Sequence, residues 1–237
     1  MVSTPNIRTV PLRAVDKIRF TFRKDGSLRW LSHHDLLRTF ERMLRRAQLP
    51  VHHSAGFHPH PRLVFALSLP LGVVGLAEVV EVEFDEAILP DDALRRLRTQ
   101  SPHGLSLLDA KSIPIGVGAK VVGLCYALTV PLERCRELSE RVATVKAAPE
   151  CLVERTRPPK RTLDIRPFLR DIRLETTTGR LEIDLSLSAA GTARPDELLA
   201  LLNCSDLPDA GCILERARLD LQDDTQLTSN PVDDADA

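Results

Sequence analysis

Alternation of apolar and polar residues marks several segments in the first part of the chain. The stretch KIRFTFRK, residues 17–24, alternates residue by residue, which is typical of a strand with one buried face. EVVEVEFDE alternates in the same way further along. The four strands predicted here are 17–24, 62–71, 78–86 and 104–113.

Two helices are predicted between these strands. Ser32 is a natural N-cap, and Asp35 is placed to complete a capping box. Apolar residues then recur at helical spacing until Pro50 ends the helix. A shorter helix opens at Pro90. The order strand-helix-strand-strand-helix-strand is that of a ferredoxin-like unit.

The same order recurs after a predicted hinge, IPIGVG at 113–118. The predicted elements are strands at 121–130, 181–188 and 212–221, strand material in 151–156 and 162–169, and helices at 132–147 and 194–202. We therefore predict an α+β protein of two tandem ferredoxin-like (βαββαβ) lobes, 17–113 and 119–221. A flexible arm (1–16) and a disordered acidic tail (222–237) flank them.

Charge is distributed unevenly, although the formal net charge is only −1. Residues 1–60 hold eleven Lys and Arg against four Asp and Glu, a surplus of seven positive charges. From Ser205 onward, nine acidic residues stand against two basic ones. This polarity predicts a basic working face at one end of the molecule.

Composition excludes several classes of protein. No stretch approaches the roughly 18–20 apolar residues that a membrane span needs, and the N-terminal segment lacks the apolar core of a secretory signal. We therefore expect a cytoplasmic protein without a membrane partner. The five cysteines show no C-x-x-C pair, which argues against a disulfide framework or zinc ribbon. Most are expected to be small buried apolar residues.

Six of the seven histidines fall between Leu31 and Pro61. Their spacing is not that of a metal site, because the helix has no H-x-x-x-H and no cysteine lies nearby, so we predict no metal. His33, in the first helical turn, and His60, on the returning segment, are candidates for an acid–base pair. A structural role for each histidine is the simpler alternative.

Arginines on the predicted helix form a ridge opposite the apolar stripe, where Glu41 is the single acidic residue placed to pair with one of them. They are either the solvated face of an amphipathic helix or a phosphate-binding surface, since guanidinium matches phosphate geometry. The predicted phosphate-binding residues are Arg29, Arg38, Arg42, Arg45, Arg46 and Arg62. The loop that follows is held in shape by Gly and Pro, and its predicted recognition residues are Ser54, Gly56, Phe57, Pro59 and Pro61.

Four stretches of the chain resemble the uncharacterised radical-SAM-linked protein family. They are RFTFRKDGSLRWLSHHDLLRTFERMLRRAQLP, HSAGFHPHPRLVFALSLPLGV, LDIRPFL and GTARPDELLALL, and the match covers about residues 17–220. His33 and His60 fit the family pattern, whereas His34 and His58 depart from it. In the second lobe the fitting residues include Asp164, Arg166, Arg194 and Asp196, which we take as further site candidates.

The resemblance implies a role beside radical SAM chemistry. Members occur as a C-terminal domain of, or a neighbour to, cobalamin-binding radical SAM proteins. This chain has no C-x-x-x-C-x-x-C motif, so an iron–sulfur cluster, SAM and cobalamin would belong to a partner and no cofactor to this chain. Members also lie near genes for ribonuclease and ribosomal proteins, which implies tRNA or ribosomal RNA as a further partner.

Three hypotheses follow for the function. The first is a non-catalytic, RNA-facing accessory module that works with a radical SAM protein in RNA or ribosome modification. With one Trp, one Tyr and seven Phe, it would recognise RNA mainly through shape and phosphate. The second is a nuclease-like or phosphoryl-transfer enzyme that uses His33 and His60. The third is a protein-docking adaptor for the radical SAM enzyme.

Overall fold

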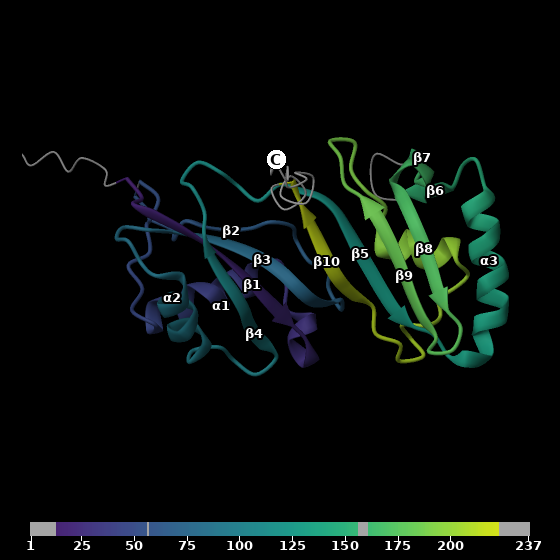
Figure 1. The fold of residues 1–237 in the computed structure, drawn as a ribbon, viewed down its shortest axis with the longest axis horizontal. Coiled ribbons are helices and arrows are strands. Elements are labelled where there is room, and N and C mark those ends of the chain that lie inside the picture. The colour runs from purple at the N-terminus through teal and green to yellow at the C-terminus, as the bar shows by residue number, and fades with distance from the viewer. Residues whose placement is uncertain (1–12, 56, 156–160, 223–237) are drawn as a thin grey trace, which may run out of the picture.

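The described part of the protein has an α+β fold in which four α-helices accompany a mixed β-sheet (Figure 1). The computed structural model describes residues 13–55, 57–155 and 161–222. The helices are α1 (His33–Arg46), α2 (Pro90–Arg98), α3 (Cys135–Ala147) and α4 (Pro195–Leu201). Short 3-10 helices are η1 (Gly26–Trp30), η2 (Leu132–Arg134) and η3 (Arg166–Phe168).

The main sheet has eight strands and joins the two halves of the chain. Its strands are β1 (Asp16–Lys24), β2 (Leu63–Phe65), β3 (Val74–Phe84), β4 (Leu105–Ser112), β5 (Val121–Thr129), β8 (Leu169–Glu175), β9 (Arg180–Ser186) and β10 (Glu215–Leu221). Seven lie in the order β4-β1-β3-β10-β5-β9-β8, and β2 pairs with β3. The β3–β10 pair is parallel and the other pairs are antiparallel. We call 13–112 the first half and 121–222 the second half.

Each half has its own apolar core. Ile18, Phe20 and Phe22 on β1 are fully buried and pack with Phe40 and Met43 of α1. In the second half, residues of α3, α4, β5 and β9 form a separate cluster. No helix of the described ranges is long and apolar enough to cross a membrane.

Lys17 and Arg19, on the polar face of β1, are also buried, although Arg23 on that face is exposed, so the prediction of a half-buried strand was incomplete. Arg19 lies opposite Glu81 of β3 and donates to its carboxylate through Nε at 3.0 Å. Lys17 Nζ lies 2.7 Å from the same carboxylate and donates to the Val117 carbonyl. A buried charge is tolerated when it is paired in this way, and alternation alone cannot reveal the pairing.

The start of α1 follows the prediction. The Ser32 hydroxyl oxygen accepts the backbone N–H of Asp35 at 3.2 Å, as an N-cap does. The Asp35 carboxylate accepts the Ser32 hydroxyl at 2.7 Å, a bond that differs from the predicted capping box, in which it would accept the Ser32 backbone N–H. The helix ends at Arg46, before Pro50, because Gln48 adopts a left-handed conformation with φ of 51°.

Three strand predictions are corrected. The stretch 62–71 forms a regular strand only at 63–65, since Leu67 and Leu69 leave the sheet and pack against the core of the second half. β8 was missed because its ladder shifts register between Leu169 and Asp171, which breaks the two-residue period. The material at 151–169 includes β6 (Leu152–Arg155) and β7 (Arg161–Asp164), which form a sheet of their own.

The predicted flanking segments are tested only at their inner ends. Of the arm 1–16, residues 13–16 are described, and Asp16 already belongs to β1. Of the tail 222–237, only residue 222 is described.

A buried ion pair fastens the two halves at the β3–β10 junction. Arg216 of β10 donates to Glu78 of β3 through Nε at 2.8 Å and contacts it again through Nη2. The same guanidinium donates to the carbonyls of Ser68 and Leu67 at 3.0 and 3.1 Å. Lys24 is buried beside them, and this burial lowers the pKa of its ammonium, against the opposing charge of Glu78.

Candidate functional site

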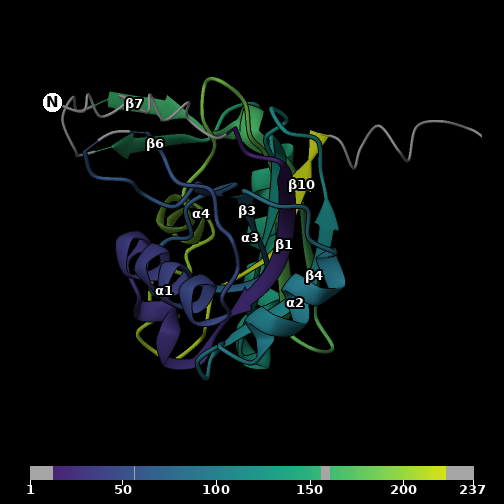
Figure 2. The ribbon, with the colours of Figure 1, turned by 90° about the vertical axis from the view of Figure 1, so that its left-hand side faces the viewer.

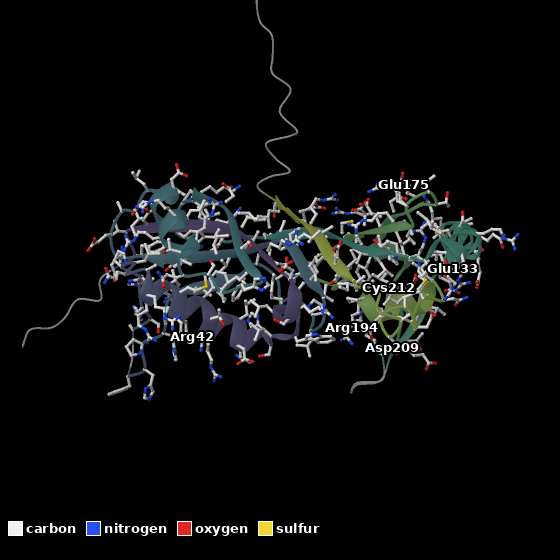
Figure 3. The ribbon with its side chains drawn as sticks, turned by 90° about the horizontal axis from the view of Figure 1, so that it is seen from below. Arg42, Glu133, Glu175, Arg194, Asp209 and Cys212 are labelled. Carbon is white, nitrogen blue, oxygen red and sulfur yellow. The ribbon has the colours of Figure 1, made fainter. Side chains whose placement is uncertain are left out.

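The arginine ridge of α1 is exposed. Arg38 is 69% exposed and lies 3.6 Å from the Asp35 carboxylate. Arg42 donates to the Thr39 hydroxyl, a neutral partner, at 3.1 Å. Within 13–55, 57–155 and 161–222, Arg42, Arg45 and Arg46 carry no ion pair. Figure 3 shows Arg42 extending away from the body of the protein. Unpaired guanidinium groups on one helix face repel one another and attract polyanions.

The two remaining predicted phosphate ligands lie on either side of α1 in the sequence. Arg29 belongs to η1, and its guanidinium carbon lies 5.1 Å from the centre of the Trp30 ring. Arg62 follows the Gly/Pro loop and is exposed. Both therefore remain accessible to an anion.

His33 and His60 are both exposed and lie in different surroundings. His33 packs edge-on to Phe65 with ring centres 5.3 Å apart, and its Nδ1 lies 3.5 Å from the Ser68 hydroxyl. His60 donates its backbone N–H to the Ser54 hydroxyl at 3.0 Å. In the described chain the two histidines share no hydrogen bond or ring contact, so an acid–base pair stays a prediction. No group of three or more His, Cys, Asp or Glu side chains there could hold a metal ion.

The predicted recognition loop is closed by its own backbone. Ser54 donates its N–H to the His60 carbonyl at 2.8 Å, and His53 pairs with Pro61 in an isolated bridge. Phe57 is completely exposed and Pro59 is exposed as well. Gly56 lies outside the described residues.

Asp164 and Arg166 of the second half hold the backbone in place. Asp164 accepts the N–H groups of Cys151 and Arg166 at 2.7 and 2.9 Å, and these bonds lower the pKa of its carboxyl. Arg166 donates to the carbonyls of Ala148, Leu169 and Lys146, which ties η3 to the end of α3. These contacts give both residues a structural role.

A cleft that the sequence did not reveal opens where the two halves meet. It encloses about 350 Å³ and has a mainly apolar lining. The first half contributes Arg29, Trp30 and 70–73, and the second half contributes Pro195, Asp196, Leu199, Pro208 and 211–214. The Val74 N–H donates to the Leu214 carbonyl at 3.0 Å, and the Gly72 N–H to the Arg29 carbonyl at 2.9 Å. These bonds fix the walls on each side.

A polar hollow of about 530 Å³ adjoins the cleft and shares Pro70, Pro195 and Asp196 with it. Glu197, at the start of α4, is buried here and accepts Arg155 at 2.6 and 3.0 Å. It also accepts the backbone N–H of Arg194 at 2.8 Å. The Arg194 side chain itself is exposed and has no ion pair among the residues that the structure describes.

Candidate residues from distant parts of the sequence therefore meet at this cleft. Arg194 and Asp196 were predicted as site residues, whereas Trp30 and the apolar lining were missed. One signal was available, because Trp30 is the single tryptophan of the chain and follows a predicted phosphate ligand. The helix α4 lines the cleft through Pro195, Asp196 and Leu199. Figures 2 and 3 show α1 and α4 on one side of the sheet, so the cleft and α1 lie on the same side.

Most of the cysteines are buried, as the sequence analysis predicted. Cys125, Cys135, Cys151 and Cys204 are buried, and only Cys212, in the cleft, is partly exposed. Burial raises the pKa of Cys125 to about 11, with the nearby Asp184 carboxylate adding to the effect.

The sequence matches the model of a family described as an uncharacterized protein conserved in bacteria (DUF2344), over residues 17–195. The chain belongs to this family. No functionally curated protein matches it. A solved structure of an unknown protein from Galdieria sulphuraria is 12% identical, with 87% of this chain and 97% of that chain covered and a TM-score of 0.27. A likeness at that level transfers neither a fold nor a function.

Proposed function

We propose that this protein is a non-catalytic, RNA-facing accessory module. The arginine ridge of α1 (Arg38, Arg42, Arg45 and Arg46), called the arginine face from here on, binds the phosphate backbone. The observation that carries the proposal is the exposed set Arg42, Arg45 and Arg46, for which the described chain offers no carboxylate partner. Guanidinium groups left open in this way supply affinity for RNA that does not depend on sequence.

We also propose that the two halves are tandem ferredoxin-like lobes. The strand pairing β4-β1-β3-β2 supports this for the first half, and β10-β5-β9-β8 supports it for the second. A βαββαβ unit is expected to have this antiparallel strand order. The partner that we propose is a radical SAM protein, which would hold the cluster, SAM and cobalamin. This partnership is supported only by the sequence resemblance.

Binding to tRNA or ribosomal RNA should depend strongly on salt. Four phosphate contacts imply that affinity falls about 100-fold between about 50 and 200 mM salt, because each contact releases counterions. Filter binding with labelled tRNA at the two salt concentrations measures this loss. Binding that is absent, or that does not change with salt, would remove the proposal.

The triple variant Arg42→Gln, Arg45→Gln, Arg46→Gln should lower the slope of log affinity against log salt by about 3. A matched control replaces Arg23, Arg95 and Arg136, which are also exposed but lie off α1, with glutamine. The control changes the net charge equally and should keep most of the slope. Equal losses in the two variants would mean that the effect comes from overall charge and not from the α1 face.

The two alternative functions stay predictions. Phosphoryl transfer would need His33 and His60 to flank one phosphate, and the described contacts do not bring them together. A docking role toward a radical SAM partner is compatible with RNA binding.

A further inference from the structure

We infer that the cleft between the two halves binds one base of a single-stranded RNA segment, stacked on Trp30, with its flanking phosphates on Arg29 and Arg194. This inference rests on the proposed function and deepens it. It assigns a chemical class of ligand, an unpaired nucleotide, to a site separate from the arginine face.

Trp30 is held in a position suited to stacking. It is 59% exposed although it is a large aromatic side chain. The ring lies against Gly72, where an added Cβ would come within 2.8 Å of it, so the wall behind the indole is backbone. Arg29 lies over the ring at 5.1 Å. An exposed indole with a guanidinium over its ring combines the two contacts, cation–π and stacking, by which proteins hold unpaired bases.

The dimensions and lining of the cleft suit a base. About 350 Å³ lies near the lower end of the range for small-ligand sites, and the walls include Val73, Leu199 and Leu214. Apolar walls accept a flat ring, while Asp196 at the shared rim offers an acceptor for the amino group of cytosine.

The charges at the rim favour a nucleotide over an apolar peptide. Arg29 and Arg194 come from opposite halves, and neither has an ion pair in the part of the chain that is described. Guanidinium groups that flank an apolar cleft match a ligand with phosphate on each side of a ring. An apolar peptide side chain would leave both arginines unmatched.

The cleft lies on the same side of the molecule as the arginine face. The helix α1 begins three residues after Trp30, and Figure 3 places Arg42 and Arg194 on the same side of the molecule. From His33 to Arg42 the helix rises about 14 Å at 1.5 Å per residue. That length matches about four phosphates at the spacing of a stacked strand. A strand bound along α1 can thus deliver one splayed base to the cleft.

Tryptophan fluorescence tests this directly, because Trp30 is the single tryptophan. The full chain is titrated with single-stranded oligocytidine of about twelve nucleotides and with an RNA duplex of equal length. We expect the single strand to quench Trp30 and the duplex to bind through α1 without quenching. Saturable binding of oligocytidine without any change in Trp30 fluorescence would overturn the inference and leave the proposed function standing. Failure of both RNAs to bind would overturn both.

Variants separate stacking from folding. Trp30→Ala should weaken oligocytidine binding about 10-fold and leave duplex binding unchanged, while Trp30→Phe restores most of the affinity. Leu132→Ala is the control, since Leu132 is also an exposed apolar residue, at 60%, but lies outside the cleft. Equal weakening of single-strand and duplex binding by Trp30→Ala would contradict a base-specific role.

Oligocytidine should also slow the alkylation of Cys212 by iodoacetamide, because Cys212 lines the cleft, whereas the RNA duplex should not. Equal alkylation rates with and without oligocytidine would argue against occupancy of the cleft.

Discussion

Replacing Glu78 by glutamine is expected to lower the free energy of unfolding by about 3–5 kcal/mol. The carboxylate is 3% exposed and faces Arg216, which is 1% exposed, with Lys24 buried nearby. Without the negative charge, two cations are left in a buried site with one neutral amide. The expected loss exceeds that of an ordinary surface substitution because the remaining charges cannot be solvated.

Urea denaturation of the full chain measures this change. Asp92→Asn is a control, since Asp92 pairs with Arg95 and Arg96 at the exposed start of α2 and should cost less than about 1 kcal/mol. Replacing Glu78 and Arg216 together with methionine should destabilise less than Glu78→Gln, because only Lys24 is then left as a buried cation, whereas Glu78→Gln leaves both Lys24 and Arg216. A loss below about 1 kcal/mol for Glu78→Gln would show that the junction does not depend on this pair.

Replacing Glu197 by glutamine should cost about 3 kcal/mol and loosen the start of α4 beside the cleft. The Glu197 carboxylate accepts both Arg155 and the Arg194 backbone N–H. Burial alone would raise its pKa, but these hydrogen bonds outweigh burial and hold the pKa of Glu197 below the ordinary value. The folded state therefore binds this proton less readily than the unfolded chain does.

The sign of the pH dependence follows from that direction. The contribution of Glu197 is fully present above the pKa of an ordinary glutamate, and it declines as the pH falls from about 5 through the lowered pKa of the folded state. The wild-type chain should lose stability over this acidic range more steeply than Glu197→Gln does. Denaturation midpoints at several pH values between about 3 and 6 measure the difference. Parallel pH profiles for the two proteins would mean that Glu197 does not titrate in this way.

Local sequence rules predicted much of the fold. Period-2 alternation located β1 and β3, and Ser32 with its capping partner located the start of α1. These rules work where the pattern follows from the backbone repeat itself. They failed at β8, where a register shift breaks the alternation, and at 66–71, where the chain leaves β3 to cover the other half.

The candidate site divides in the same way. The arginines of α1 could be predicted because they lie on one face of one helix. The cleft could not, because Trp30 and Asp196 approach each other only through the parallel β3–β10 pair. His33 and His60 both fall within the histidine-rich stretch, yet His33 contacts the Phe65 ring whereas the His60 backbone donates to the Ser54 hydroxyl.

The sequence by itself determined the α+β class, the polar and apolar faces of α1 and the surplus of positive charge in residues 1–60. Those features depend on residue type and on spacing within one element, so they can be predicted without knowing how the rest of the chain folds. The tertiary structure alone decided that Glu78 meets Arg216, and that η1 and α4 together line a cleft. Such contacts depend on which strands become neighbours, and no local period encodes that choice.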